Sequence, residues 1–253
     1  MSIRVVTSEY NDQYHLDTWI PKLNKLEYNY TIYHKKDNLQ IGEEIITDDN
    51  NIFIPNYGRC EYAFLYHIIK NYDTLDDYTL FVKSHWYIDN TNFFNHLYKC
   101  KLYDYLSSGH SMRYTIWNKD DDIYDNSNQI IERYFYPNNH PFVKSIKDIY
   151  NLVYSDSIPL PKIQTKWAGG IPCFSVSKKL IIRHPKNIYI KLLEQFYPQS
   201  WDIQKGFKYF NTIEEQIIDV GKHYHDVYGR FWSEFFTHNL PTDKKFNILH
   251  LNE

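Results

Sequence analysis

Short apolar runs alternate with helix-like segments in the first third of the chain, and this order limits the folds that the chain can adopt. Residues 3–7, 28–33 and 79–82 are rich in β-branched and aromatic side chains, a composition typical of buried strands. Residues 17–23 and 61–71 lie between these runs and have helical character. Strands that alternate with helices predict a mainly parallel sheet that is covered on both faces.

The later segments extend this pattern. Pro21 limits the first helix to one or two turns, and Ser177 is a plausible N-cap for a later one. Strands are also expected at residues 52–53 and 167–176, and helices at residues 92–105, 143–150, 177–184, 188–196, 212–219 and 227–238. Residues 107–160 are rich in Asp, Asn, Tyr and Pro and predict an irregular insertion. We therefore expect one α/β domain over residues 1–253, with a mixed, mainly parallel central sheet flanked by helices.

Composition excludes several classes of protein. The 253 residues are 43% hydrophobic, which is enough for one sizeable core. A net charge of -3 and the lack of a basic run longer than His34-Lys35-Lys36 argue against a nucleic-acid partner. No apolar stretch approaches the roughly 20 residues that a membrane span needs, and the first residues begin a strand without a signal peptide.

The cysteine and tyrosine content indicates where in the cell the protein is expected. The three cysteines are scattered, which indicates neither a zinc site nor a disulfide framework and favours a reducing, cytoplasmic compartment. The 25 tyrosines suit core edges and sugar-stacking surfaces. Their excess, with that of Asn, Ile and Lys, also fits an AT-rich genome such as that of a large virus. In that case the host cytoplasm or the virion is the expected location.

Polar residues follow each predicted strand of the first third. In an open α/β sheet, ligands bind at the carboxyl ends of the strands. A turn with glycine before the helix at 61–71 belongs to the same end. The candidate binding residues at these strand ends and in this turn are Thr7, Glu9, Tyr10, Tyr33, Lys35, Asn56, Gly58, Arg59, Lys83, Ser84 and His85.

Several of these motifs resemble those of the DUF3431 domain family. The most specific pieces are residues 56–61 (Asn-Tyr-Gly-Arg-Cys-Glu), 66–77 and 80–86. Weaker pieces are residues 5–7, 33–35, 173–177 and 231–236. In motif order this family is similar to the nucleotide-sugar glycosyltransferases of the GT-A type. These enzymes have an Asn-x-Gly turn, a helix, and a strand that ends in an Asp-x-Asp metal motif. The last position here holds Lys83-Ser84-His85.

The resemblance implies a glycosyltransferase that moves a sugar from a nucleotide-diphosphate donor to a hydroxyl group of a carbohydrate or protein. Such an enzyme must neutralise the diphosphate leaving group. His85 could bind Mn²⁺ or Mg²⁺ with support from Ser84, or Lys83 could supply the charge without metal. A third reading is a strand end whose polar residues only face solvent. Two other functions stay open, namely a non-catalytic nucleotide- or carbohydrate-binding domain that retains the fold, and a phosphate-handling enzyme.

The remaining candidates have specific roles in a nucleotide-sugar site. Arg59 can hold a phosphate at the start of a helix, while Gly58 permits the turn before it. Tyr10 could stack on the base, with Thr7 and Glu9 in the same loop. Ordinary loop and cap roles are the alternatives for all of them.

Two later groups complete the candidates. Trp167, Gly169 and Gly170 suit close approach and stacking of a sugar, or a turn packed by a core Trp.

Asp226 or Glu234 could be the base that deprotonates the acceptor. His223 and His225 are two residues apart, a spacing that can chelate metal, although structural roles are the alternative.

Overall fold

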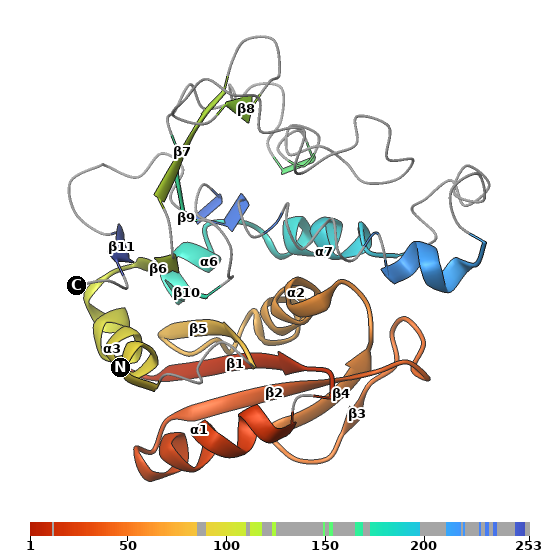
Figure 1. Cartoon of the computed structure of the whole chain (residues 1–253), viewed down its shortest axis with the longest axis horizontal. Coiled ribbons are helices and arrows are strands. Elements are labelled where there is room, and N and C mark those ends of the chain that lie inside the picture. The colour runs from red at the N-terminus through yellow and green to blue at the C-terminus, as the bar shows by residue number, and fades with distance from the viewer. Residues whose placement is uncertain are drawn as a thin grey trace.

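The computed structural model describes most of the first half of the chain and shorter stretches after it (Figure 1). The described residues are 1–11, 13–84, 90–109, 112–117, 123–124, 149, 152–153, 165–168, 173–197, 211–218, 220, 228, 231–232, 235–236 and 246–250. No helix in these stretches is both long and apolar enough to cross a bilayer.

An eight-stranded sheet forms the centre of the described structure, in the order β11-β6-β10-β5-β1-β2-β4-β3. Its strands are β1 (Ile3–Glu9), β2 (Asn29–Lys36), β3 (Ile45–Ile46), β4 (Asn51–Pro55), β5 (Tyr78–Lys83), β6 (Tyr105–Gly109), β10 (Phe174–Ser177) and β11 (Phe246–His250). Strands β1, β2, β4 and β5 pair in parallel, as β6 does with β11. Strand β10 is antiparallel to both of its neighbours, β5 and β6, and β3 is antiparallel to β4. The predicted fold class, mixed α/β with a mainly parallel sheet, is confirmed.

A small second sheet lies in the region that was expected to be irregular. Its order is β8 (Ile123–Tyr124), β7 (Met112–Trp117) and β9 (Thr165–Ala168), with antiparallel pairs. The expected insertion at 107–160 therefore contains regular strands among its described residues.

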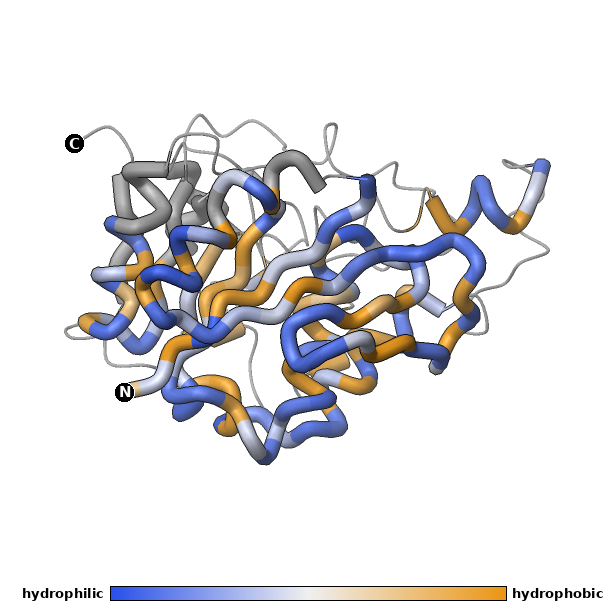
Figure 2. Tube along the Cα trace, turned by 90° about the horizontal axis from the view of Figure 1, so that it is seen from below, coloured by the Kyte–Doolittle hydropathy of each residue, from blue (hydrophilic) through white to orange (hydrophobic). Residues whose placement is uncertain are grey.

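Helices cover both faces of the central sheet (Figure 1). The helical segments are α1 (Gln13–Lys25), α2 (Arg59–Asn71), α3 (Asn90–Lys99), the 3-10 turn η1 (Cys100–Leu102), α6 (Lys178–Ile181) and α7 (Lys186–Glu194). One core cluster joins α2 and α7 to the strand face that carries Val6, Tyr33 and Phe81. The other joins α1, α3 and η1 to the face that carries Val5 and Ile32. Hydrophobic stretches run along the strands, whereas the loops around them are mostly hydrophilic (Figure 2).

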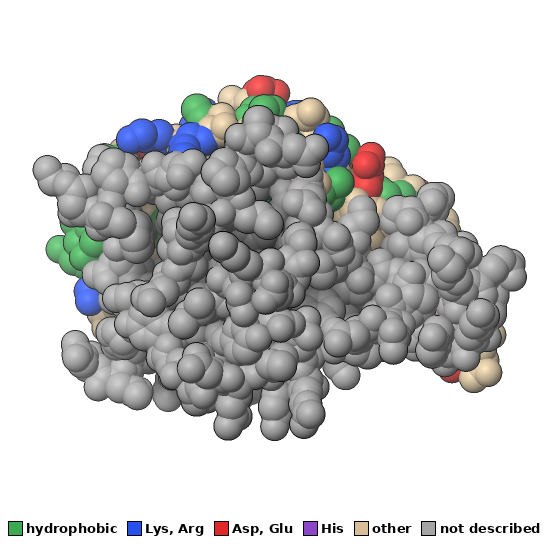
Figure 3. All heavy atoms as spheres, turned by 90° about the horizontal axis from the view of Figure 1, so that it is seen from above, with side chains coloured by type: hydrophobic (Ala, Val, Ile, Leu, Met, Phe, Trp, Pro, Cys, Tyr) green, Lys and Arg blue, Asp and Glu red, His purple; other side chains and the backbone are tan. Residues whose placement is uncertain are grey.

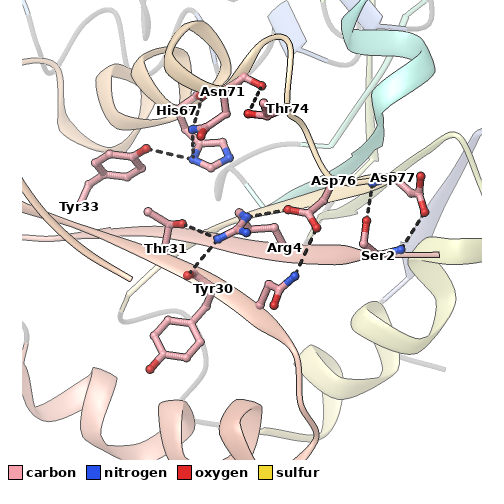
Figure 4. Close-up of polar contacts among 11 residues, drawn as sticks. Ser2, Arg4, Tyr30, Thr31, Tyr33, His67, Asn71, Thr74, Asp76 and Asp77 are labelled. Carbon is pink, nitrogen blue, oxygen red and sulfur yellow. Dashed lines mark hydrogen bonds and ion pairs between the residues drawn. The ribbon is translucent and has the colours of Figure 1, made fainter. Parts of the chain in front are cut away.

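The amino ends of the parallel strands are joined by ion pairs and hydrogen bonds (Figure 4). Nε of Arg4 lies 2.6 Å from a carboxylate oxygen of Asp76, and Arg4 also donates to the Thr31 hydroxyl over 3.2 Å. Asn29 donates to the same carboxylate over 3.3 Å. Ser2 and Asp77 exchange two hydrogen bonds, of 2.8 and 3.0 Å. These contacts connect β1, β2 and the loop before β5.

Several local expectations need correction. Helix α1 has 13 residues and contains Pro21 in its interior, so the proline does not end it. Buried Leu16 and Leu23 lie on either side of Pro21, and their packing against the sheet compensates for the one hydrogen bond that a proline removes. The helix expected at 92–105 ends at Lys99, because Tyr105 already pairs with β10.

Other expectations hold. Ser177 is the N-cap of α6, and its hydroxyl accepts a hydrogen bond from the backbone N–H of Leu180 over 3.4 Å. Helix α2 lies within two residues of its expected bounds.

Candidate functional site

The parallel strands bring most of the predicted binding residues to one end of the sheet. In the pairing register, Glu9 lies opposite His34, and Ser8 lies opposite both Tyr33 and Lys83. Lys36 lies opposite Pro55, which directly precedes the Asn56 turn. The carboxyl ends of β1, β2, β4 and β5 therefore meet, and we call this region the carboxyl end of the sheet.

Side chains at this end divide between the two faces of the sheet. Alternate residues of a strand point to opposite faces. Lys35 and Lys83 share a face with Tyr33 and Phe81, which pack under α2. Residues Glu9 and His34 share the other face with Val5 and Ile32, which pack on α1. The carboxyl end thus holds two polar clusters, one on each face.

The first cluster surrounds the start of α2. Gly58 has φ 56° and Arg59 has φ 51°, so two successive residues adopt left-handed backbone. This conformation is uncommon for arginine and costs free energy. A Cβ atom at position 58 would lie 2.3 Å from the Phe196 ring, so only glycine fits there. Gly58 supplies no side-chain cap to α2.

Lys35 is the central cation of this cluster. Its side chain is buried, and its ammonium donates a hydrogen bond to the backbone carbonyl of Tyr57, in the turn before α2. The same nitrogen lies 5.3 Å from the centre of the Tyr62 ring. Burial lowers the pKa of Lys35 to about 7, although the nearby thiol of Cys60 and carboxylate of Glu61 oppose the shift. The Lys35 amine is therefore poised to gain a proton near neutral pH.

Arg59 and Lys83 are two further cations near the start of α2. Arg59 contributes to lowering the pKa of Lys35. Burial raises the pKa of the Cys60 thiol well above its usual value, and Lys83 and Lys35 both act against that increase. Glu61 is also fully buried here and accepts a hydrogen bond from Cys60 over 3.2 Å. Lys35 of β2 and Lys83 of β5 thus lie on the α2 face of the sheet, and Arg59 begins α2 two residues before the buried carboxylate of Glu61.

On the surface nearby, three loops are joined through Asp37. The Tyr10 hydroxyl donates to Asp37 over 2.7 Å, and the Asn56 side-chain amide donates to it over 2.8 Å. The hydrogen bond from Asn56, then that from Tyr10, lowers the pKa of Asp37. The loops after β1, β2 and β4 are therefore held together by one ionised carboxylate, and the Tyr10 ring remains exposed.

The second cluster is a chain of hydrogen bonds on the α1 face. His34 Nδ1 lies 2.6 Å from Glu9, and His34 Nε2 lies 2.9 Å from the Asn51 carbonyl oxygen. The Asn51 amide donates to Asp48 over 3.0 Å, which orients its carbonyl toward His34. Both ring nitrogens of His34 then face acceptors, an arrangement that favours the doubly protonated ring. Burial lowers the pKa of His34, but the bonds to Glu9 and Asn51 outweigh it and raise the pKa.

Two predicted binding residues are fully buried. The Tyr33 hydroxyl lies 3.0 Å from His67 Nδ1 beneath α2 (Figure 4). Thr7 is buried on the opposite face of the sheet. Contact of either residue with a ligand stays a prediction.

Several predicted residues fall outside the described part of the chain: His85, Gly169, Gly170, His223, His225, Asp226 and Glu234. Trp167 lies in β9, of which only the backbone is described. Ser84 is buried immediately after β5.

The sequence analysis missed Asp37, Asp48 and Asn51. Asp37 directly follows the second strand, and that position was the available signal.

The described residues of this end do not fit a divalent cation. Hard cations prefer several oxygen ligands, mostly carboxylates. The first cluster instead presents two ammonium groups and a guanidinium group. No group of three or more metal-ligating side chains occurs within the described residues.

Comparisons with known proteins give only a weak structural likeness. No family model matches, and no curated protein is similar to it. Among solved structures, the crystal structure of S. aureus TarS 1-349, a glycosyltransferase, is similar with 12% identity and a TM-score of 0.31. The match covers 78% of this chain and 56% of that one, so the chain spans about half the length of TarS 1-349. The similarity is to a glycosyltransferase-like fold and assigns no activity.

Proposed function

We propose that the carboxyl end of the sheet binds the diphosphate of a nucleotide sugar, and that the protein transfers the sugar to a hydroxyl acceptor on a carbohydrate or protein. The observation that carries this proposal is the position of three cations at the carboxyl end of the sheet: Lys35 donates to the turn before α2, Arg59 begins α2, and Lys83 ends β5 on the same face. The start of a helix adds its own partial positive charge. Together these groups favour a ligand with more than one negative charge.

The leaving group explains why such a cluster would be useful. Transfer of a sugar leaves a nucleoside diphosphate, whose negative charge grows in the transition state. Fixed positive groups aimed at that charge accelerate the reaction, and losing one costs about 100-fold in rate. Lys35 fits this role because an amine with a pKa of about 7 gains its proton as an anion binds. Lys83 and Arg59 supply permanent charge.

The cations take the place that a metal ion has in related chemistry. We therefore propose a metal-free leaving-group site, in which Lys83 replaces the acidic motif. Tyr10, joined to Asp37 and exposed, is positioned to stack on the base at the rim. Asp226 and Glu234 remain the proposed bases for the acceptor hydroxyl.

Thermal unfolding in the presence of nucleotides tests the donor site. The melting temperature is measured with UDP, GDP, CDP and their sugars, with and without Mn²⁺. A ligand at about 100 times its Kd stabilises the fold by about 2.7 kcal/mol. For a chain of this size that raises the melting temperature by roughly 5–10 °C. We expect one nucleotide family to do so equally well without Mn²⁺, and Lys83→Met to abolish the shift.

Activity is measured separately as release of nucleoside diphosphate from the sugar that binds. Binding without release, in the presence of a wide set of acceptors, would identify a non-catalytic nucleotide-sugar-binding domain. If no nucleotide stabilises the protein at millimolar concentration, the donor site is refuted.

A further inference from the structure

Three large apolar side chains are exposed together on the α1 and α3 side of the sheet. Leu26, just after α1, is 51% exposed; Tyr98 on α3 is 74% exposed; and Leu102 at the end of η1 is 64% exposed. Tyr98 lies at the end of α3 and Leu102 at the end of the 3-10 turn that follows it, so the two exposed side chains are near each other along the chain. Single exposed apolar residues need no explanation, but three on neighbouring elements form a patch.

The two segments that carry these residues are neighbours in space. Leu23 of α1 and Leu97 of α3 belong to the same core cluster, with Cys100 of η1. Tyr28, two residues after Leu26, packs on that cluster, and the Cys100 thiol contributes to raising its pKa after burial. The end of α1 therefore lies beside η1, and Leu26 can share one surface with Leu102.

The same surface is basic, although the chain as a whole is not. Lys25, Lys99 and Lys101 are exposed beside the three apolar residues; Glu27 is the exposed acid among residues 25–28 and 98–102, and Asp17 is exposed further along α1. The net charge of the whole chain is -3. Figure 3 shows the molecule from the side away from α1, with some hydrophobic and basic side chains at its left margin. We call Leu26, Tyr98, Leu102, Lys25, Lys99 and Lys101 the basic apolar face.

We propose that the basic apolar face docks on a membrane surface that contains anionic lipids. Leucine side chains can enter the boundary between head groups and acyl chains, and tyrosine prefers that interface. Lysines next to them contact anionic head groups, and each contributes about fivefold to binding. The face projects from two helical segments rather than lining a groove, which suits a flat lipid surface. The proposal is independent of the proposed transferase activity.

The chain contains a matched control for this idea. Ile45 and Ile46 on the outermost strand β3 are 52% and 55% exposed. Their apolar exposure is similar, but Glu43 and Glu44 precede them directly. An anionic lipid surface repels carboxylates, so this second patch should not contribute to binding.

Co-sedimentation of the full chain with vesicles tests the proposal. The probes are vesicles of phosphatidylcholine alone and vesicles with about 30% phosphatidylserine. We expect binding to the second kind only, and its loss at high salt. The triple variant Lys25→Glu, Lys99→Glu, Lys101→Glu should bind at least 100-fold more weakly. The triple variant Leu26→Ser, Tyr98→Ser, Leu102→Ser should lose at least tenfold.

The control variant Ile45→Ser, Ile46→Ser should bind as the unaltered chain does. Circular dichroism establishes that each variant is folded before binding is measured. The proposal is overturned if the unaltered chain does not prefer phosphatidylserine vesicles, or if the control variant loses as much as the face variants. It is also overturned if sedimentation velocity shows that the face joins two copies of the chain and no vesicle binding accompanies this.

Discussion

The two ends of the same parallel strands carry charged residues in opposite arrangements. At the amino end, Arg4 lies 2.6 Å from Asp76, and Asn29 and Thr31 complete the hydrogen bonds of the pair (Figure 4). At the carboxyl end, Lys35 donates to a neutral backbone carbonyl and lies near two other cations. The amino end therefore holds a close ion pair, whereas the α2 face of the carboxyl end holds three cations and one buried carboxylate, Glu61.

The pKa values express this difference. Burial raises the pKa of Asp76, but the bond and charge of Arg4 outweigh it and lower the pKa, so the pair stays ionised. Lys35 shows the opposite result, a pKa lowered to about 7 by burial. Burying the Lys35 charge costs free energy that the nearby Glu61 carboxylate offsets only in part, because the net shift of the Lys35 pKa is downward. Such a cost is expected where the charge serves a ligand rather than stability.

The largest expected effect is at the turn that positions the cations. Gly58→Ala would place Cβ 2.3 Å from Phe196 and keep φ at 56°. We expect a loss of about 4 kcal/mol in the free energy of unfolding, the sum of backbone strain and overpacking. Urea denaturation measures it. Gly42→Ala is the control, because Gly42 has φ 85° but no atom within 4 Å of its Cβ position, and about 1 kcal/mol is expected. Equal losses would show that the Phe196 contact is unimportant.

The next effect separates activity from stability. We expect Lys35→Met to reduce transfer about 100-fold, or about 3 kcal/mol in the transition state. Its free energy of unfolding at about pH 8 should change by less than about 1 kcal/mol, because an amine with a pKa of about 7 is mostly neutral there. If the Lys35→Met variant is fully active, Lys35 is not part of the donor site.

The matching change at the amino end should reduce stability and leave activity unchanged. Arg4→Met leaves the partly buried Asp76 carboxylate without its guanidinium, which costs about 2 kcal/mol of stability by urea denaturation. The kcat of the folded enzyme should not change. A large loss of kcat would mean that the two ends are coupled.

The two ends should also respond to pH in opposite directions. The folded-state pKa of His34 lies above 6.5, so its contribution is complete below pH 6.5 and is lost as pH rises through the raised value. The pKa of Asp76 lies below 3.8, so its contribution is present above pH 3.8 and is lost as pH falls through the lowered value.

Unfolding in urea between about pH 3 and pH 9 measures both contributions. His34→Gln should remove the alkaline part alone, and Asp76→Asn the acidic part alone. If His34→Gln follows the unaltered protein at alkaline pH, the Glu9–His34 pair does not hold these strand ends.

The smallest expected effect is that of chelation. If Lys83, Lys35 and Arg59 neutralise the diphosphate, EDTA should leave the rate of transfer unchanged. Loss of activity in EDTA, restored by Mn²⁺, would show that a metal ion provides the charge.

The sequence predicted features that depend on local order. Ser177 as N-cap, the helix at 61–71 and the meeting of strand ends all follow from short-range patterns. Features set by distant residues were not predictable in this way. Pro21 sits inside a helix because the sheet holds both halves of it, and Tyr33 is internal because of its position in the strand alternation.

In the candidate site too, locally determined features were predictable from sequence and features set by distant residues were not. Glycine and arginine in a turn before a helix indicated an anion site from sequence alone. The hydrogen bonds of Asp37 to Tyr10 and Asn56, and of Asn51 to His34, join residues that are 17–27 apart in sequence, so no local pattern predicts them. The low pKa of Lys35 likewise depends on burial beneath a helix that follows it in the chain.

The position of β10 between β5 and β6 has a consequence for synthesis on the ribosome. The segment from β1 to β5 can assemble as soon as Lys83 has emerged, but the neighbour of β5 begins at Phe174. That delay is about 90 residues, or roughly 5–20 s at common elongation rates. During this time the apolar edge of β5 is an open template for pairing with other nascent chains. Slow elongation after residue 83 should therefore lower the yield of folded protein, and a chaperone that covers β5 should restore it.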